Sequence, residues 1–421
     1  MTEPAGADGG TRMEVIVDPE LTARALAWVA CGATLGTFTG LIPGIHANNV
    51  ALVLASLAPG LPGTALGVGI GILSAGVVHT FVNVVPALAL GVPDAETAAT
   101  TLPGHRLVLA GRGEEAIRLS ALGSGLAVLA AVPLAIPLTR GMTAVYPTLS
   151  ANVAVVLGAV LVGLVAAESG ARSRLGGLLA QAGSGALGVV ALDLDPAAPL
   201  EAGGMLAPLF AGLFGAPILL EAMDGGGVPR QTGTAVRSSR RRVVLTAVAG
   251  AMAGAIVGYL PAVSAAIAAV AVLACVPGGD DDRAYVVATS GVDTANAIFA
   301  LVALVALGQP RSGVIVAFEQ SGAPLTLAVL VPCVVLAGAL GFLVTLLVGD
   351  RYLRAVGRVD QRWLSVGVLA VLGMLSWLFA GTVGVLAFLA ATAVGLVPAR
   401  LGARRVHLMG VLLVPLLVWS V

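Results

Sequence analysis

The sequence predicts an all-α polytopic protein that crosses a membrane many times. Of its 421 residues, 58% are hydrophobic and only 10% are charged, whereas an ordinary soluble domain carries about 25% charged residues. A soluble core cannot bury that much apolar surface, so lipid must surround most of the chain. The apolar segments lack the alternating polarity of a transmembrane β-barrel. At about 20 residues per helical crossing, they leave room for about ten to twelve transmembrane or re-entrant helices.

The charged residues and cysteines argue against several other classes of protein. Basic and acidic residues number 22 each, and every basic residue is Arg, so no nucleic acid or other polyanion is expected as a partner. Cys31, Cys275 and Cys333 stand alone in apolar segments, without the paired spacing of a metal site or a disulfide. We interpret them as small buried hydrophobic residues. Neither a metal nor an organic cofactor is expected.

Arginine clusters predict which loops face the cytoplasm, because short loops rich in Lys or Arg stay on that side. The acidic loop 193–203 and the segment 139–147 are expected outside. The polar, acidic N-terminus lacks the basic start and short apolar core of a signal peptide. The first crossing must therefore direct the chain to the cytoplasmic membrane, with the N-terminus outside. The clusters expected inside are 106–118, 172–174, 230–242, 351–362 and 400–405.

The chain is expected to consist of two related halves. Residues 33–47 align without gaps on residues 251–265, and the shared residues include two glycines and a proline in each segment. A second match pairs Gly91 and Pro93 with Gly308 and Pro310. The longest hydrophilic break lies between the two matching regions. The expected divisions are a polar tail (1–20), a first transmembrane repeat (21–224), an Arg- and Gly-rich cytoplasmic linker (225–242) and a second transmembrane repeat (243–421).

The two halves are expected to have opposite orientations in the membrane. The loop after Pro93 carries an arginine cluster and should face the cytoplasm, whereas the loop after Pro310 should face outside. Equivalent points on opposite faces indicate an inverted-topology repeat, which is typical of secondary transporters with a site near the bilayer midplane. The alternative is a coincidental match in apolar sequence of low complexity.

A first candidate site follows Gly36 and Gly40, where a proline should break the first crossing. Irregular backbone at membrane depth is tolerated where it lines a watery cavity. The next segment, 48–58, is too short to cross, so it is expected to be a re-entrant half-helix whose N-terminus attracts an anion. Alternatively, the glycines only permit close helix packing and the polar residues lie at the interface. The candidate residues are Pro43, Gly44, His46, Asn48 and Asn49, with Pro261 and Ser264 as their counterparts.

A second polar cluster lies within the next apolar segment of each half. In the first half it contains His79, Thr80 and Asn83, which are candidates for contact with the solute. His79 can titrate near physiological pH, or it can be a satisfied buried histidine. In the second half the leading residue is Asp293, because an acidic residue within an apolar helix is a functional candidate by default. Alternatively, the helix begins later and Asp293 lies near its boundary. The candidates for ion coupling are Ser290, Asp293, Thr294 and Asn296.

Residues 40–49 and 91–125 resemble the large membrane subunit of tripartite tricarboxylate transporters, the TctA family. Gly40, Pro43 and Gly44 match an element near the family's first helix. The sequence departs from the pattern at Asp94, where the family usually has Gly, and at Pro103, where it often has Asp. The residues that match the second element are Pro93, Thr97, Thr100, Thr101, Gly104, Gly111 and Gly113.

The resemblance implies uptake of citrate or another di- or tricarboxylate, driven by a Na⁺ or H⁺ gradient. It also implies a small membrane subunit and an extracytoplasmic solute-binding protein as partners. The solute would lie between the breaks at Pro43 and Pro261, near Thr97 and Thr100, with Asp293 serving the cation. Alternative functions are a translocase of a lipid-linked phosphate and a permease for another small organic anion. An enzyme is not expected, because the sequence contains no nucleophile–base set and no phosphate-binding Gly loop.

Overall fold

A computed structural model describes residues 18–43, 47, 50–51, 54, 60, 63–91, 101–200, 204–223, 228–233, 235–259, 268–269, 272, 281–308 and 310–420. This part of the chain is helical, without strands. Seven helical segments are long and apolar enough to cross a membrane, and three shorter apolar helices accompany them. The seven are α1 (Pro19–Gly40), α3 with α4 (Ala65–Val82, Val84–Leu90), α6 (Gly113–Ala151), α11 (Arg240–Tyr259), α13 (Asp282–Leu307), α15 (Leu327–Val356) and α16 with α17 (Gln361–Gly395, Val397–Leu401). The remaining elements are α5 (Thr101–Leu109), α7 (Val153–Ala166), α8 (Ala171–Ala191), α9 (Leu206–Phe210), η2 (Ala211–Gly215), α10 (Ala216–Ala222), α14 (Gly313–Gln320), η3 (Arg405–Met409) and α18 (Gly410–Trp419).

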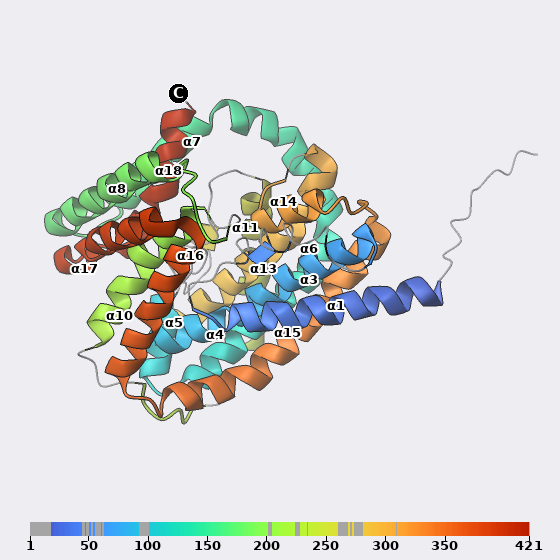
Figure 1. The fold of residues 1–421 in the computed structure, drawn as a ribbon, viewed down its shortest axis with the longest axis horizontal. Coiled ribbons are helices and arrows are strands. Elements are labelled where there is room, and N and C mark those ends of the chain that lie inside the picture. The colour runs from blue at the N-terminus through green and yellow to red at the C-terminus, as the bar shows by residue number, and fades with distance from the viewer. Residues whose placement is uncertain are drawn as a thin grey trace, which may run out of the picture.

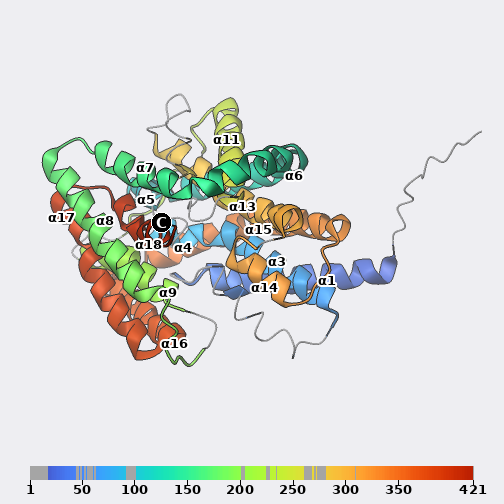
Figure 2. The same ribbon diagram turned by 90° about the horizontal axis from the view of Figure 1, so that it is seen from above.

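The helices pack as two bundles, and each bundle takes helices from both halves of the chain. The central bundle contains α1, α3, α6, α11, α13 and α15, with one continuous apolar core. The outer bundle contains α7, α8, α9, α16 and α18, which share a second core, together with α10, which packs on α16, and α17, which packs on α8. Figures 1 and 2 show the two groups side by side, with α8, α16 and α17 on the left and α1, α3 and α6 on the right. A third apolar cluster joins them where α4, α5 and α6 meet α10 and α16.

Glycines bring α1 into backbone contact with α3. The three glycines on one face of α1 are each too close to α3 for a side chain. A Cβ on Gly32 would overlap the carbonyl oxygen of Gly71, and a Cβ on Gly36 would overlap that of Ala75. A Cβ on Gly40 would lie 2.9 Å from the Cβ of Val82. These glycines thus permit the close helix packing that was the alternative interpretation of them, and the backbone of α1 lies directly against α3.

The α11–α13 pair repeats this packing in the same register. A Cβ on Gly250 would lie 2.6 Å from the carbonyl oxygen of Ala288, and a Cβ on Gly254 would lie 2.7 Å from that of Val292. Gly258 approaches the Cβ of Phe299 at 3.0 Å. The three glycines and the residues that they meet follow the same spacing as in α1 and α3. The residues matched by sequence in the two halves therefore make equivalent contacts.

The ends of these helices also correspond. α1 ends at Gly40 and α11 at Tyr259, each shortly before one of the two matched prolines. Gly91 ends α4 and Gly308 ends α13, both in the left-handed conformation, with φ of 71° and 65°. Glycine adopts this conformation without the steric cost that a Cβ would add. The second sequence match, which pairs Gly91 with Gly308, thus marks the end of the helix that packs on α1 and the end of the helix that packs on α11.

Arginine clusters that are distant in sequence meet around buried carboxylates. Glu115, at the start of α6, is fully buried and accepts from Arg283 Nε at 2.9 Å and from the backbone N–H of Arg237 at 2.8 Å. Arg112 forms a further ion pair with it. These contacts satisfy a buried charge that would otherwise be very costly. They also hold the predicted linker against the start of α6 and α13.

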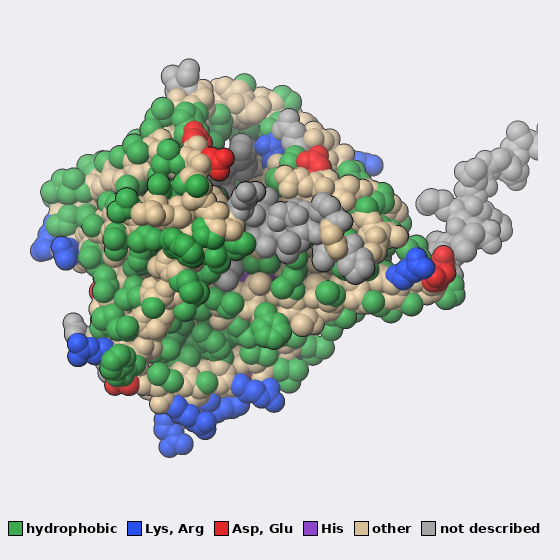
Figure 3. Space-filling model, in the orientation of Figure 1, with side chains coloured by type: hydrophobic (Ala, Val, Ile, Leu, Met, Phe, Trp, Pro, Cys, Tyr) green, Lys and Arg blue, Asp and Glu red, His purple; other side chains and the backbone are tan. Residues whose placement is uncertain are grey.

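A second carboxylate connects elements of the outer bundle. Glu168, between α7 and α8, accepts from the backbone N–H and from Nε of Arg404 at 3.0 Å and lies 2.9 Å from His407 Nε2. Burial alone raises the pKa of the Glu168 carboxyl, but these hydrogen bonds outweigh it and leave the pKa below its usual value. Figure 3 shows arginines at the lower edge, where α15 ends and α16 begins, and on the left beside α8 and α17. Arg172 also donates to the carbonyl oxygen of Arg400, so the arginine clusters at 172–174 and 400–405 lie beside each other.

Alanine at Gly36 or Gly254 should destabilise the protein by about 1–3 kcal/mol, because the added Cβ would overlap a carbonyl oxygen of the partner helix. Gly158, in the middle of α7, is a matched control with no heavy atom near its missing Cβ. Alanine there should preserve or raise stability, since alanine is the better helix former. Thermal unfolding in detergent measures the difference. Equal melting temperatures for the three variants would contradict the close approach of the paired helices.

Candidate functional site

Polar side chains from three helices lie buried inside the central bundle, among largely apolar neighbours. On α13, Ser290, Asp293 and Thr294 share one face, because residues three and four apart in a helix lie side by side. Ser120 and Ser124 share a face of α6 in the same way, and Thr80 and Asn83 share a face of α3. Each of these side chains is at most 8% exposed. We call them the polar core: Thr80, Asn83, Ser120, Ser124, Ser290, Asp293 and Thr294.

Hydrogen bonds join the three helices of the polar core. Ser120 Oγ lies 2.7 Å from Ser290 Oγ, and Ser124 Oγ donates to the carbonyl oxygen of Ser290 at 3.1 Å. Thr80 Oγ1 donates to the carbonyl oxygen of Val77 at 2.8 Å and lies 3.5 Å from Thr294 Oγ1. Since the proton of Thr80 is already used, Thr294 is the donor in the contact between α3 and α13. Ser290 and Thr294 thus link α13 to α6 and to α3.

Asp293 lies well inside α13 and away from its ends. The helix begins at Asp282 and continues to Leu307, which places Asp293 about 16 Å from its start at 1.5 Å per residue. The side chain is 4% exposed. The alternative that its helix begins later and leaves it at a boundary is therefore wrong. A carboxyl group at this depth costs several kcal/mol unless it is paired or solvated, and it stands beside the hydroxyl groups of Ser290 and Thr294.

His79 faces α1 rather than α13. It is 1% exposed, and its Nδ1 lies 3.0 Å from Thr39 Oγ1 near the end of α1. His79 also lines a small space together with Ala47 and Ala51, which follow Pro43 in the chain. Asn296, on α13, is half-buried and lies against Gly254 as His79 lies against Gly36. The two residues are equivalent in the matched helix pairs.

The structure brings some of the predicted site residues together and leaves others outside its description. Pro43 lies in the turn after α1 and is half-buried. Thr80 and Thr294 meet, and with Asn83, Ser290 and Asp293 they belong to the polar core. The predicted residues outside the described part of the chain are Gly44, His46, Asn48, Asn49, Thr97, Thr100, Pro261 and Ser264.

Sequence reasoning missed three residues of this region. Ser120 and Ser124 stand four residues apart in an apolar helix, and this spacing alone was a signal that they share a face. Thr39 precedes Gly40, and nothing in the sequence distinguishes it from a threonine that only donates to its own helix backbone, as it does here to Leu35. Its contact with His79 depends on packing between helices, which the sequence does not reveal.

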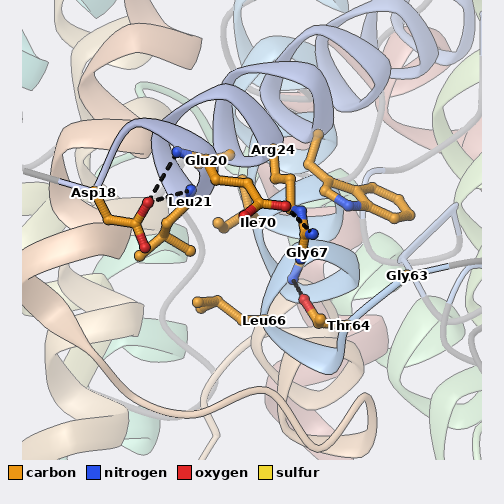
Figure 4. Close-up of a pocket in the computed structure, with 11 residues that line it drawn as sticks. Asp18, Glu20, Leu21, Arg24, Gly63, Thr64, Leu66, Gly67 and Ile70 are labelled. Carbon is orange, nitrogen blue, oxygen red and sulfur yellow. Dashed lines mark hydrogen bonds and ion pairs between the residues drawn. The ribbon is translucent and has the colours of Figure 1, made fainter.

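A pocket of about 380 Å³ lies away from the polar core, between the first turns of α1 and α3. Figure 4 shows Asp18, Glu20, Arg24 and Thr64 around it. Asp18 accepts from two backbone N–H groups of α1, Thr64 accepts from Gly67 N, and Glu20 pairs with Arg24. The polar groups of this pocket thus serve as helix caps and a surface ion pair. Residues 67 and 79 of α3 are separated by about 18 Å along the helix, so the pocket is not the predicted site.

The chain is similar to a known protein family and to an archaeal protein. The profile of the tripartite tricarboxylate transporter TctA family matches residues 26–410, from α1 to the first residue of α18. An uncharacterized protein of Methanocaldococcus jannaschii is 24% identical over 402 residues, which cover 94% of this chain and 98% of that protein. No solved structure matches the chain. Both similarities extend through the central and outer bundles.

Alanine substitutions at Ser120 and Ser290 should be non-additive. Either substitution removes one member of a buried hydroxyl pair and should cost about 1–2 kcal/mol, because the remaining hydroxyl loses its partner. The double variant should cost less than the two single variants together. Unfolding of all four proteins in detergent with increasing SDS measures the interaction energy. Strict additivity would indicate that the two hydroxyls do not interact.

Proposed function

We infer the function from one premise: the chain belongs to the tripartite tricarboxylate transporter TctA family. Membership makes it a multi-pass membrane transporter, not an enzyme. It also implies a tricarboxylate permease that works in a tripartite system with other subunits. We propose that this permease takes up citrate or a similar di- or tricarboxylate across the cytoplasmic membrane. A Na⁺ or H⁺ gradient drives the uptake, and the N-terminus lies outside.

The polar core carries this proposal. Among its seven buried polar side chains, the carboxyl group of Asp293 is rare in an apolar helix and is a functional candidate by default. The polar core lies in the bundle whose helices α1 and α11 end near Pro43 and Pro261. Asp293 binds the coupling cation or carries the proton, assisted by Ser290, Thr294 and Asn296. A carboxylate beside hydroxyl oxygens suits both Na⁺ and H⁺. Its negatively charged oxygens can bind the metal ion or take up the proton.

The solute lies between the two helix breaks, where ends of interrupted helices attract an anion. His79, Thr80 and Asn83 form the α3 side of this site. The first helix break contributes Pro43, Gly44, His46, Asn48 and Asn49 to the solute site. The second break contributes Pro261 and Ser264, and the remaining solute contacts come from Thr97 and Thr100. His79, Ala47 and Ala51 line one small space, which supports this placement because α3 then lies beside the chain that follows Pro43.

The equivalent packing of α1 on α3 and of α11 on α13 supports a two-fold repeat. We propose that the repeats have opposite orientations in the membrane, so that the two breaks approach the site from opposite sides. Rocking of one part against another would then expose the site alternately to the two faces. Arginines in the loop after Pro93 and few charges in the loop after Pro310 support this orientation.

Replacement of Asp293 by Asn should abolish gradient-driven accumulation of citrate, because the amide can neither carry the proton nor neutralise a cation. The measurement is uptake of radiolabelled citrate into proteoliposomes that contain the chain with the other subunits of its system. Asp193→Asn is the matched control, because Asp193 is exposed in a loop, and it should transport normally. Unchanged accumulation by the Asp293→Asn variant would refute the coupling role.

The choice of solute can be tested without a gradient. Purified protein should bind citrate and should not bind a polyprenyl phosphate, because the proposed site accepts a small anion with several carboxylates. Isothermal titration with the two ligands, and with a monocarboxylate as a third, measures this preference. Binding of polyprenyl phosphate in place of citrate would favour a translocase of a lipid-linked phosphate instead.

A further inference from the structure

A groove of about 400 Å³ lies between α7 and α8, at the surface of the outer bundle. Figures 1 and 2 show α8 at the outer edge of the molecule. Val162 and Leu178 are 70% and 52% exposed, and exposed apolar side chains of a multi-pass membrane protein lie against lipid. We call this space the α7–α8 groove. Its apolar lining consists of Leu161, Val162, Val165, Ala166 and Leu178.

The α7–α8 groove has a charged end and an apolar length. Arg174, in the first turn of α8, lines it beside the residues that end α7. Gln181 lines it about 10 Å further along α8, at 1.5 Å per residue. The side chain of Gln181 is 8% exposed, and its Nε2 donates to the carbonyl oxygen of Leu161 at 3.1 Å. This hydrogen bond holds the two helices together beneath the groove.

Positive charge gathers at the charged end of the groove. Arg174 Nε donates to the backbone carbonyl oxygen of Glu168 at 3.1 Å, and Arg404 Nε donates to the Glu168 carboxylate at 3.0 Å. Arg172 Nη2 donates to the carbonyl oxygen of Arg400 at 2.9 Å. The Glu168 carboxylate balances one of these four positive charges. The surface around the end of the groove therefore attracts anions.

Arg174 has donors to spare for such an anion. A guanidinium group carries five N–H donors, and the hydrogen bond to Glu168 uses only the one on Nε. Within the described part of the chain, no hydrogen bond uses the two Nη atoms of Arg174. Two Nη atoms of arginine form a fork that matches the oxygens of a phosphate group. The alternative is that Arg174 serves only to hold the turn between α7 and α8.

We propose that the α7–α8 groove binds an anionic phospholipid such as phosphatidylglycerol. The phosphate group lies on the Nη atoms of Arg174, and one acyl chain follows the apolar lining toward Gln181. Basic pockets between membrane helices select anionic over zwitterionic head groups. A free phosphate ion would use only the charged end, whereas a lipid also covers the exposed apolar wall. The inference is independent of the transported solute and of the orientation of the two halves.

Photolabelling in nanodiscs of phosphatidylcholine tests the proposal. A trace of phosphatidylglycerol or phosphatidylcholine with a diazirine in its acyl chain is activated by light, and mass spectrometry identifies the labelled peptides. The phosphatidylglycerol probe should label residues 161–181 more strongly, and unlabelled phosphatidylglycerol should compete. Equal labelling by both probes would overturn the selection of an anionic lipid. Competition by glycerol phosphate would assign the charged end to a soluble anion instead. No labelling of 161–181 would mean that a protein covers the groove, which would also overturn the proposal.

Replacement of Arg174 tests the contact with the head group. Arg174→Gln should require about a tenfold higher content of unlabelled phosphatidylglycerol for the same competition, the effect of one lost hydrogen bond to a charged group. Arg174→Lys keeps the charge and should retain most of the preference. Arg351→Gln is the matched control, because Arg351 is also exposed and donates to a backbone carbonyl oxygen, and it should compete as wild type does. Wild-type competition in Arg174→Gln would overturn the phosphate contact.

A bulky residue in the groove tests the position of the acyl chain. Val162→Trp should fill the groove and remove the preferential labelling of 161–181. Val155→Trp is the matched control, because Val155 is also 70% exposed, seven residues earlier on α7, and does not line the groove. It should preserve the labelling. Thermal unfolding checks that both variants fold. Preferential labelling that persists in Val162→Trp would overturn the placement of the chain in the groove.

Discussion

The close approach of helix backbones at two sets of glycines is the constraint on which the rest of this structure depends. Lipid tails are as apolar as the side chains of the helices, so the hydrophobic effect does not drive helices together in the membrane. Helices associate there through close packing and through polar contacts. Gly36 in α1 and Gly254 in α11 each rest on a carbonyl group of the partner helix. This packing holds α3 against α1 in the same way as it holds α13 against α11. The polar residues of α3 and α13 meet because their helices are held at these positions.

A polar interior in an apolar bundle requires that its members satisfy one another. Ser120, Ser124 and Ser290 do so between α6 and α13, and Thr80 and Thr294 do so between α3 and α13. Glu115 and Arg283 hold the starts of α6 and α13 together. The ion pair near the helix ends and the hydroxyl contacts deeper inside thus act on the same two helices. They keep α6 and α13 in register around Asp293.

Much of the architecture could be predicted from the sequence, because lipid imposes strict rules on composition and length. The all-α class follows from the scarcity of charges, and the matched glycines and helix ends follow from the alignment of 33–47 with 251–265. Asp293 could be recognised because a carboxylate in an apolar helix is rare. Ser120 and Thr39 could not be singled out, since Ser and Thr are common in membrane helices and acquire a role only through a partner on another helix. The division into two bundles could not be predicted from the sequence either, because it depends on which apolar helix faces pack together.

The bundle division has a consequence for how the chain is made. The first segment of the outer bundle, 153–222, is synthesised before the central bundle receives α11, α13 and α15, and long before its own partners α16 and α18 exist. During that interval α8 exposes Gly177 and Gly188, which later pack against His407 and the backbone of Val411. Contacts between such distant segments form slowly and leave surfaces open to wrong partners. Biogenesis of this protein therefore requires that an early helical segment wait in the bilayer, or be sheltered by the insertion machinery, until the C-terminus arrives.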